Sequence, residues 1–80
     1  MEDIFEEIEQ ERYLQDKKWG EQNHPPDYWM VILMEELGEA CKEICGKSIN
    51  LQAYREEMVQ VAAVAVAALE CLDRGRRTHG

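Results

Sequence analysis

Four oxygen-bearing side chains are spaced so that they could hold a metal ion. Glu36 and Glu39 lie three residues apart, and Glu57 and Gln60 repeat that spacing about twenty residues later. Residues three apart share one face of a helix, so two adjacent helices would bring the two pairs together. Clustered carboxylates repel one another, and a fold that gathers them usually places a hard cation between them. The spacing therefore predicts a Mg²⁺ site, with Mn²⁺ as a substitute, at the edge of a helical core.

Other interpretations of the polar residues are open or weak. Each acidic pair could belong to a solvated helix surface, which would make the chain a purely structural acidic module. Cys41 and Cys45 are one helical turn apart, but with His24 and His79 they match no zinc-binding spacing and are better interpreted as buried thiols. The chain has no nucleophile elbow and no glycine-rich phosphate loop. The acidic pairs are therefore the main candidates for chemistry.

Composition limits the class of protein and of partner. The chain has 80 residues, a net charge of −8 and 45% hydrophobic residues. This favours one small domain over residues 1–80, with a core over about 2–73 and a frayed basic tail over 74–80. The charge argues against a nucleic-acid partner, but a divalent cation can still bridge carboxylates and nucleotide phosphates. Three cysteines without a signal peptide favour free thiols in the cytoplasm, and the apolar run over 61–69 is too short to cross a membrane.

The sequence predicts an all-α fold with three main helices and no strand. The first helix is expected over Glu2–Trp19, with acidic residues in its first turns, lysines in its last turn and Gly20 as its stop. One face of this helix begins apolar and becomes polar at Arg12 and Gln15. These two side chains either pair with neighbouring helix charges or face a polar site.

The second helix is predicted to follow a loop over residues 20–26, with Asp27 as its cap. It should end near Cys45, with Gly46 as its stop. Apolar residues recur at three- and four-residue steps and form a core stripe of Trp29, Leu33, Leu37, Ala40 and Ile44. Gly38 lowers helix stability, which a close approach by another helix or by a ligand would explain.

The third helix is predicted over about Leu51–Asp73, with Ser48 or Asn50 as its cap. Residues 61–69 are apolar all the way round, which is typical of a helix buried on every side. Two other helices of so short a chain cannot surround it. We therefore expect a helical bundle with a four-helix core that is completed by dimerisation, or by assembly into a tetramer.

Two segments resemble a known enzyme family. The residues Glu36-Leu37-Gly38-Glu39, followed by Glu-Met-Val-Gln-Val-Ala-Ala at 57–63, resemble the Glu-x-x-Glu … Glu-x-x-Asp signature of MazG-like nucleoside triphosphate pyrophosphohydrolases. This family belongs to an all-α superfamily with dimeric dUTPases and phosphoribosyl-ATP pyrophosphatase. The resemblance covers about residues 10–72. Its first part is similar to the first helix and loop of a short phage- and bacterium-type subgroup, through Glu11-Arg12, Gln15-Asp16, Lys18-Trp19-Gly20 and Gln22-Asn23-His24.

The resemblance implies a fold, an activity and a metal site. The family fold is a helical bundle completed by dimerisation, and the activity is hydrolysis of a nucleoside triphosphate to a monophosphate and pyrophosphate, which cleans the nucleotide pool. The metal is Mg²⁺, which neutralises phosphate charge and lowers the pKa of a bound water. By position, Glu36, Glu39 and Glu57 would be its ligands, with Gln60 at the fourth place. Glu35 and Glu36 are the expected catalytic residues, Glu35 by orienting a water or a ligand.

Six residues of the first helix and loop are candidates for binding the nucleotide. The three cations among them would neutralise phosphate charge, and the tryptophan offers a surface on which a base could stack. The candidates are Arg12, Gln15, Lys17, Lys18, Trp19 and Asn23.

One position departs from the family's pattern, because Gln60 stands where the family has an aspartate. A glutamine offers a neutral amide oxygen but no charge, which should weaken metal affinity or change which metal is held. Glu56 is not taken to replace the missing carboxylate, because it falls about 100° away from Glu57 around the third helix. The alternative function is therefore a catalytically weak or inactive helical dimer that binds a nucleotide or a protein partner.

Overall fold

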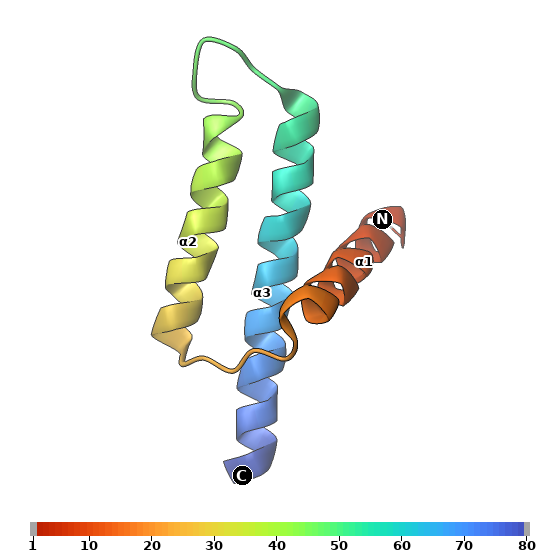
Figure 1. Ribbon diagram of the computed structural model, residues 1–80, viewed down its shortest axis with the longest axis vertical. Coiled ribbons are helices and arrows are strands. Elements are labelled where there is room, and N and C mark those ends of the chain that lie inside the picture. Colours follow the sequence, from red (N-terminus) through yellow and green to blue (C-terminus); the bar gives the residue numbers. More distant parts are fainter. Residues whose placement is uncertain (1, 80) are drawn as a thin grey trace.

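Three helices make up the computed structural model, which describes the backbone of residues 2–79 and the side chains of residues 3–75. They are α1 (Glu2–Trp19), α2 (Pro26–Lys42) and α3 (Leu51–His79), and residues 2–79 contain no strand. Figure 1 shows α2 and α3 side by side and antiparallel, with α1 lying across α3 at an angle. Both shorter helices pack on α3, which is therefore the central element. The prediction of an all-helical chain with three helices is confirmed.

Two helix ends follow from the side chains that were expected to form them. α1 ends where Gly20 adopts a φ of 74° and donates its backbone N–H to the carbonyl of Asp16 at 2.8 Å. A glycine in this left-handed conformation is a common helix stop, because other residues are strained there. α3 begins with the Asn50 side chain accepting the backbone N–H of Ala53 at 3.0 Å. Asn50 is therefore the cap of α3, one of the two caps that the sequence offered.

The start of α2 differs from its prediction. The helix begins at Pro26, and Pro25 occupies the capping position without a side-chain hydrogen bond. Proline suits the first position of a helix, since its fixed φ is helical and its missing N–H is not needed there. Asp27 lies inside the first turn, where its carboxylate accepts the backbone N–H of Tyr28 at 2.9 Å. The expectation that Asp27 caps α2 is therefore wrong, although its charge still suits the positive end of the helix.

The other end of α2 comes earlier than predicted. The helix ends at Lys42 instead of near Cys45. The carbonyl of Glu43 accepts the backbone N–H of Asn50 at 2.9 Å, which turns the chain back toward α3. Gly46 is not among the described glycines with positive φ, so it does not form a left-handed stop.

α3 continues to His79, past the predicted end at Asp73. The extra turn holds the connection between α1 and α2. The guanidinium of Arg74 donates to the backbone carbonyl of Gln22 at 3.0 Å and to the side-chain oxygen of Asn23 at 3.0 and 3.2 Å. The side chains of the basic tail beyond Gly75 lie outside the described residues.

The core of the single chain is small. Its buried hydrophobic residues are Trp29, Ala40, Ala63, Val64 and Ala67. The predicted stripe of α2 is only partly covered, because Leu37 and Ile44 remain 47% and 38% exposed. A Cβ atom added at Gly38 would meet no atom within 4 Å, so no described part of the chain makes the close approach that was expected there. Among the described helices, none combines the length and the apolar character that crossing a membrane requires.

Candidate functional site

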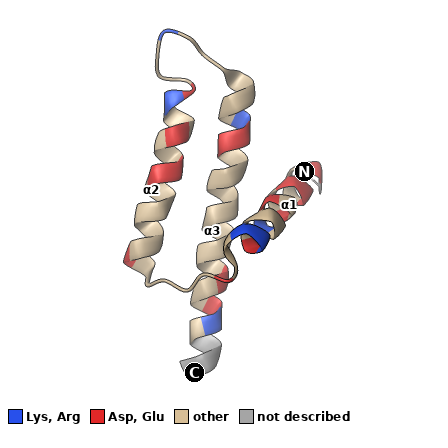
Figure 2. Ribbon diagram, in the orientation of Figure 1, with Lys and Arg blue, Asp and Glu red and all other residues tan. Residues whose placement is uncertain are grey.

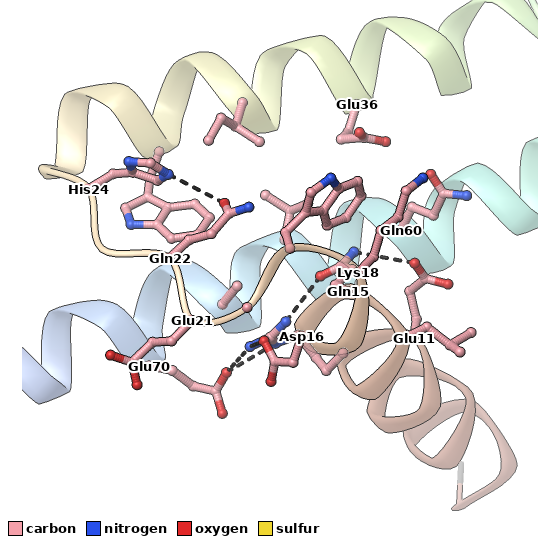
Figure 3. A pocket seen from close by; sticks show the side chains of 18 of the residues that line it. Glu11, Gln15, Asp16, Lys18, Glu21, Gln22, His24, Glu36, Gln60 and Glu70 are labelled. Carbon is pink, nitrogen blue, oxygen red and sulfur yellow. Dashed lines mark hydrogen bonds and ion pairs between the residues drawn. The ribbon is translucent and has the colours of Figure 1, made fainter.

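A cavity of about 720 Å³ lies between the C-terminal half of α1, the loop that follows it, and the sides of α2 and α3 that face them. Figure 3 shows that α2 contributes Glu36 and that α3 contributes Gln60 and Glu70. The structure brings six of the predicted site residues to this cavity: Arg12, Gln15, Lys18, Trp19, Glu36 and Gln60. Residues that the sequence assigned to catalysis, to metal binding and to substrate binding therefore share one cavity.

Figure 2 shows acidic segments in the halves of α2 and α3 that are nearer to their connection, at about the same level of the antiparallel helix pair. Glu36 is partly buried, and this burial raises its pKa above the ordinary value. Four neighbouring carboxylates raise the pKa further, in decreasing order Glu57, Glu39, Glu11 and Glu35. These charges come from all three helices and act on one carboxyl group. Glu36 is therefore the centre of the acidic cluster.

The predicted ligands do not form a complete metal site in this conformation. Among the described residues, no group of three or more His, Cys, Asp or Glu side chains is arranged to hold a metal ion. Glu39 is exposed and pairs with Lys42 at 3.3 Å, and neither Glu39 nor Glu57 is among the residues that line the cavity. The donors still suit Mg²⁺ in kind, because they are oxygens and carry negative charge. Mg²⁺ commonly takes one or two carboxylates and completes its shell with waters and substrate phosphates. Glu57 acts on Glu36 more strongly than the other carboxylates do, so these two residues are the candidates for holding it.

Arg12 pairs with neighbouring charges and also lines the cavity. The two interpretations of this residue, as a partner of helix charges and as part of a polar site, are therefore compatible. Its guanidinium donates to the same carboxylate oxygen of Glu70 at 2.7 and 3.0 Å, and to Asp16 at 3.0 Å. It also donates to the amide oxygen of Gln15 at 3.1 Å, and Gln15 donates in turn to Glu11 at 3.4 Å. Two carboxylates thus offset the charge of Arg12, which ties α1 to α3 more than it offers a free cation to a phosphate.

The remaining substrate-binding candidates separate into two groups. Lys18 and Trp19 line the cavity, with the Lys18 ammonium 4.8 Å from the centre of the indole ring, which itself is 57% exposed. Lys17 lies outside the cavity, and its ammonium sits 5.4 Å from the centre of the Tyr13 ring. Asn23 is also outside it, since its side chain accepts hydrogen bonds from the end of α3. Lys18 and Trp19 are therefore the better candidates for contact with a nucleotide.

Sequence reasoning missed several residues of the cavity wall. Glu70 belongs to it because α1 crosses α3 where Arg12 can reach it, and no local pattern signals that crossing. His24 belongs to it as well, with its ring 5.1 Å from the ring of Trp29 and its Nε2 atom 3.3 Å from the amide oxygen of Gln22. The pair of prolines that follows His24 was the available signal, because it fixes how this loop enters α2.

Known proteins give no further guide to this cavity. Comparisons with protein-family models, with curated proteins and with solved structures found no match. What the cavity can do therefore follows from its side chains and from the resemblance carried by the two acidic segments.

The three cysteines are free thiols, but their placement differs from the prediction. Cys41 and Cys45 are exposed, so the expectation that they are buried is wrong. The early end of α2 explains this for Cys45, which lies beyond the helix, in the connection to α3. Cys71 is partly buried, and its thiol donates to the backbone carbonyl of His24 at 3.5 Å.

The raised pKa of Glu36 makes a prediction about stability and pH. A carboxyl group whose pKa is raised by folding costs stability when it is ionised, and this cost declines as the pH falls below the raised folded pKa and is gone below the ordinary pKa. Without divalent metal, we expect Glu36→Gln to be more stable than the parent at pH 7 and to lose this advantage below about pH 4, where the group is protonated in both states. Thermal melts of both proteins across this range measure the difference.

Divalent metal supplies the control for the same pair of proteins. A cation bound near Glu36 would offset the repulsion in the parent but has less to offset in the variant. Mg²⁺ should therefore raise the melting temperature of the parent more than that of Glu36→Gln. A variant that is no more stable than the parent at pH 7 without metal would contradict the electrostatic account of the cluster.

Proposed function

We propose that this protein is a Mg²⁺-dependent nucleoside triphosphate pyrophosphohydrolase, which releases a nucleoside monophosphate and pyrophosphate. The observation that carries the proposal is the position of Glu36, partly buried among carboxylates from three helices at the wall of a cavity of about 720 Å³. Cavities that bind small molecules are commonly about 300–1,000 Å³, so a nucleotide fits this size. Acidic side chains outnumber basic ones along the wall, so a divalent cation that accompanies the phosphates would offset the repulsion, which is how such enzymes take their substrate.

Different side chains of the cavity would have different roles in this reaction. Bound Mg²⁺ would neutralise phosphate charge and make a water more acidic. Glu36 would hold this Mg²⁺ at the cavity wall, and Glu35, the other catalytic candidate, would orient the attacking water. Lys18 and Trp19 offer a cation and an aromatic face for the phosphates and the base. Arg12 holds α1 against α3, so it positions that wall.

Gln60 supports a second candidate function, the binding of a nucleotide without turnover. It is partly buried and lines the cavity together with Glu36, at the place where the resembled family has an aspartate. The missing charge lowers the negative potential that holds a divalent cation. In this alternative the chain is a nucleotide-binding helical protein whose site no longer activates water.

One assay separates these functions. The protein is incubated with a panel of NTPs and dNTPs in Mg²⁺ or in Mn²⁺, and pyrophosphate and monophosphate are measured. The proposed enzyme forms both products in equal amounts. If no product appears but a nucleotide with Mg²⁺ raises the melting temperature, the binding alternative is favoured, because a ligand of the folded state must stabilise it. If neither occurs with any nucleotide, the acidic residues form only a structural surface.

We also propose that a second copy of the chain completes the bundle. The support is an apolar groove along α2 and α3, on which a single chain leaves large side chains uncovered, among them Met30, Leu69 and Leu72. Small residues such as Ala65 and Ala68 line the same groove and would let a further helix approach closely. Equilibrium sedimentation should give a mass at least twice that of the chain. A mass equal to one chain at micromolar concentration would contradict the proposal.

A further inference from the structure

Two thiol groups lie close together at the C-terminal end of α2. The sulfur atoms of Cys41 and Cys45 are 3.3 Å apart, and both residues are exposed. Cys41 belongs to the last turn of the helix, whereas Cys45 follows its end at Lys42. Disulfide exchange requires that a thiol can be reached by its reaction partner and that the second thiol can reach the first. Both conditions are met here.

The backbone around Cys45 leaves room for the two sulfur atoms to join. A disulfide bond is about 2.05 Å long, so the sulfur atoms need to approach by about 1.3 Å. The backbone N–H of Cys45 donates to the carbonyl of Cys41 at 2.9 Å, which keeps the two residues adjacent. Cys45 lies in a bend outside the helix, and a Cβ atom added at the next residue, Gly46, would meet no atom within 4 Å beyond its chain neighbours. The chain can therefore adjust here without breaking α2.

The third cysteine does not compete for this bond. The Cys71 thiol contacts the backbone of His24, next to the first residues of α2. Cys41 lies in the last turn of α2, whose 17 residues span about 25 Å. Cys71 is thus at the opposite end of the helix from the pair.

We propose that Cys41 and Cys45 form a reversible redox-modification site that closes to an intrachain disulfide, with a low-molecular-weight disulfide such as oxidised glutathione as the oxidant. The sulfur of one cysteine attacks the oxidant, forms a mixed disulfide and releases one small thiol. The sulfur of the other cysteine attacks the mixed disulfide and releases the second small thiol. The two thiol protons of the protein end on the two released thiols, the oxidant is reduced, and the pair is oxidised.

Closure would fix the turn between α2 and α3. The bond would link the last turn of α2 to the connection that leads into α3, next to the hydrogen bond from Asn50 to Glu43. Because the pair is exposed, reduced glutathione can reach the closed bond and reopen it. This site is separate from the cavity that Glu36 lines, since neither cysteine is among the residues of that cavity wall.

The test uses the full chain with Cys71→Ser, which leaves the pair intact and removes the third thiol. This protein, at about 1 μM, is equilibrated in glutathione buffers from fully reduced to fully oxidised, and free thiols and intact mass are measured. We expect a reversible loss of both thiols with a mass lower by two hydrogen atoms. A local concentration on the order of 1 mM favours closure over cross-linking of two chains by about a thousandfold.

The matched control is the double variant Cys71→Ser, Cys45→Ser, in which the second step is impossible. It should accumulate the mixed disulfide at Cys41, seen as the added mass of one glutathione. The proposal is overturned if the Cys71→Ser protein keeps both thiols in oxidised glutathione, if it stops at the mixed disulfide as the control does, or if its disulfides join two chains. Circular dichroism of each species verifies that the compared proteins are folded.

Discussion

Replacing Glu57 with glutamine is expected to lower the rate of pyrophosphate release by about 100-fold or more. Glu57 is the carboxylate that acts most strongly on Glu36, and it approaches from the neighbouring helix. Glutamine keeps the shape of the side chain but removes its charge. Losing a group that supports a metal ligand typically costs about 10–100-fold in metal affinity or activity, and losing a ligand itself should cost at least the upper value. Glu36→Gln should cost at least as much, because it removes the carboxylate at the centre of the cluster.

The matched control is Glu56→Gln, which makes the same chemical change one residue away. Glu56 is exposed and lies on another side of α3, so this variant should keep most of the parent's activity. The rates are compared at saturating Mg²⁺ and again across a Mg²⁺ titration. If Glu56→Gln and Glu57→Gln lose activity equally, the loss reflects only the change in net charge, and the proposed role of Glu57 is wrong.

Gln60→Asp completes this series, because it restores the charge that the resembled family carries at this position. If the parent hydrolyses nucleotides, the variant should bind Mg²⁺ more tightly and need less of it. If the parent only binds nucleotides, the appearance of product with Gln60→Asp would identify this one side chain as what the site lacks. A variant that binds Mg²⁺ no better than the parent would remove Gln60 from the proposed ligands.

Local chemistry was enough to predict much of the fold. α1 has the bounds that its charges and Gly20 indicate, and α3 begins after Asn50 because that side chain reaches the free amide of the first turn. The end of α2 was missed because it depends on a hydrogen bond from Asn50 back to Glu43 across the turn into α3, a contact that the apolar pattern of a helix does not encode. Where an element ends through its own residues the sequence is informative, and where it ends through a distant partner it is not.

The residues of the candidate site also separate into those that local spacing predicts and those whose place depends on contacts between helices. The three-residue spacing along α2 and α3 was sufficient to place Glu36 and Gln60 on facing sides of the helix pair. The spacing could not show that Glu39 turns outward to Lys42, because an ion pair along the helix surface satisfies the same pattern. It also could not find Glu70, whose place beside Arg12 depends on the angle at which α1 crosses α3. Crossing angles follow from the packing of whole surfaces, and no short segment encodes them.

The largest effect on stability is expected from Trp29→Ala. Trp29 is 7% exposed and packs with Val64 and Ala67 in the buried cluster between α2 and α3, while its ring also meets that of His24. Removing a buried tryptophan typically costs about 3–5 kcal/mol, from lost burial and from the cavity that remains. Small domains are stable by only about 5–15 kcal/mol, and the core of this chain is small, so most of its stability should be lost.

The second tryptophan provides the matched control, because Trp19 is 57% exposed. Trp19→Ala removes the same side chain from the surface and should change the free energy of unfolding by no more than about 0.5 kcal/mol. Urea unfolding followed by circular dichroism measures both variants without relying on tryptophan fluorescence, at one protein concentration so that any association of chains is constant. Equal losses in the two variants would mean that Trp29 does not anchor α2 to α3. A large loss confined to Trp29→Ala would show that the buried tryptophan, and not the exposed one, anchors α2 to α3.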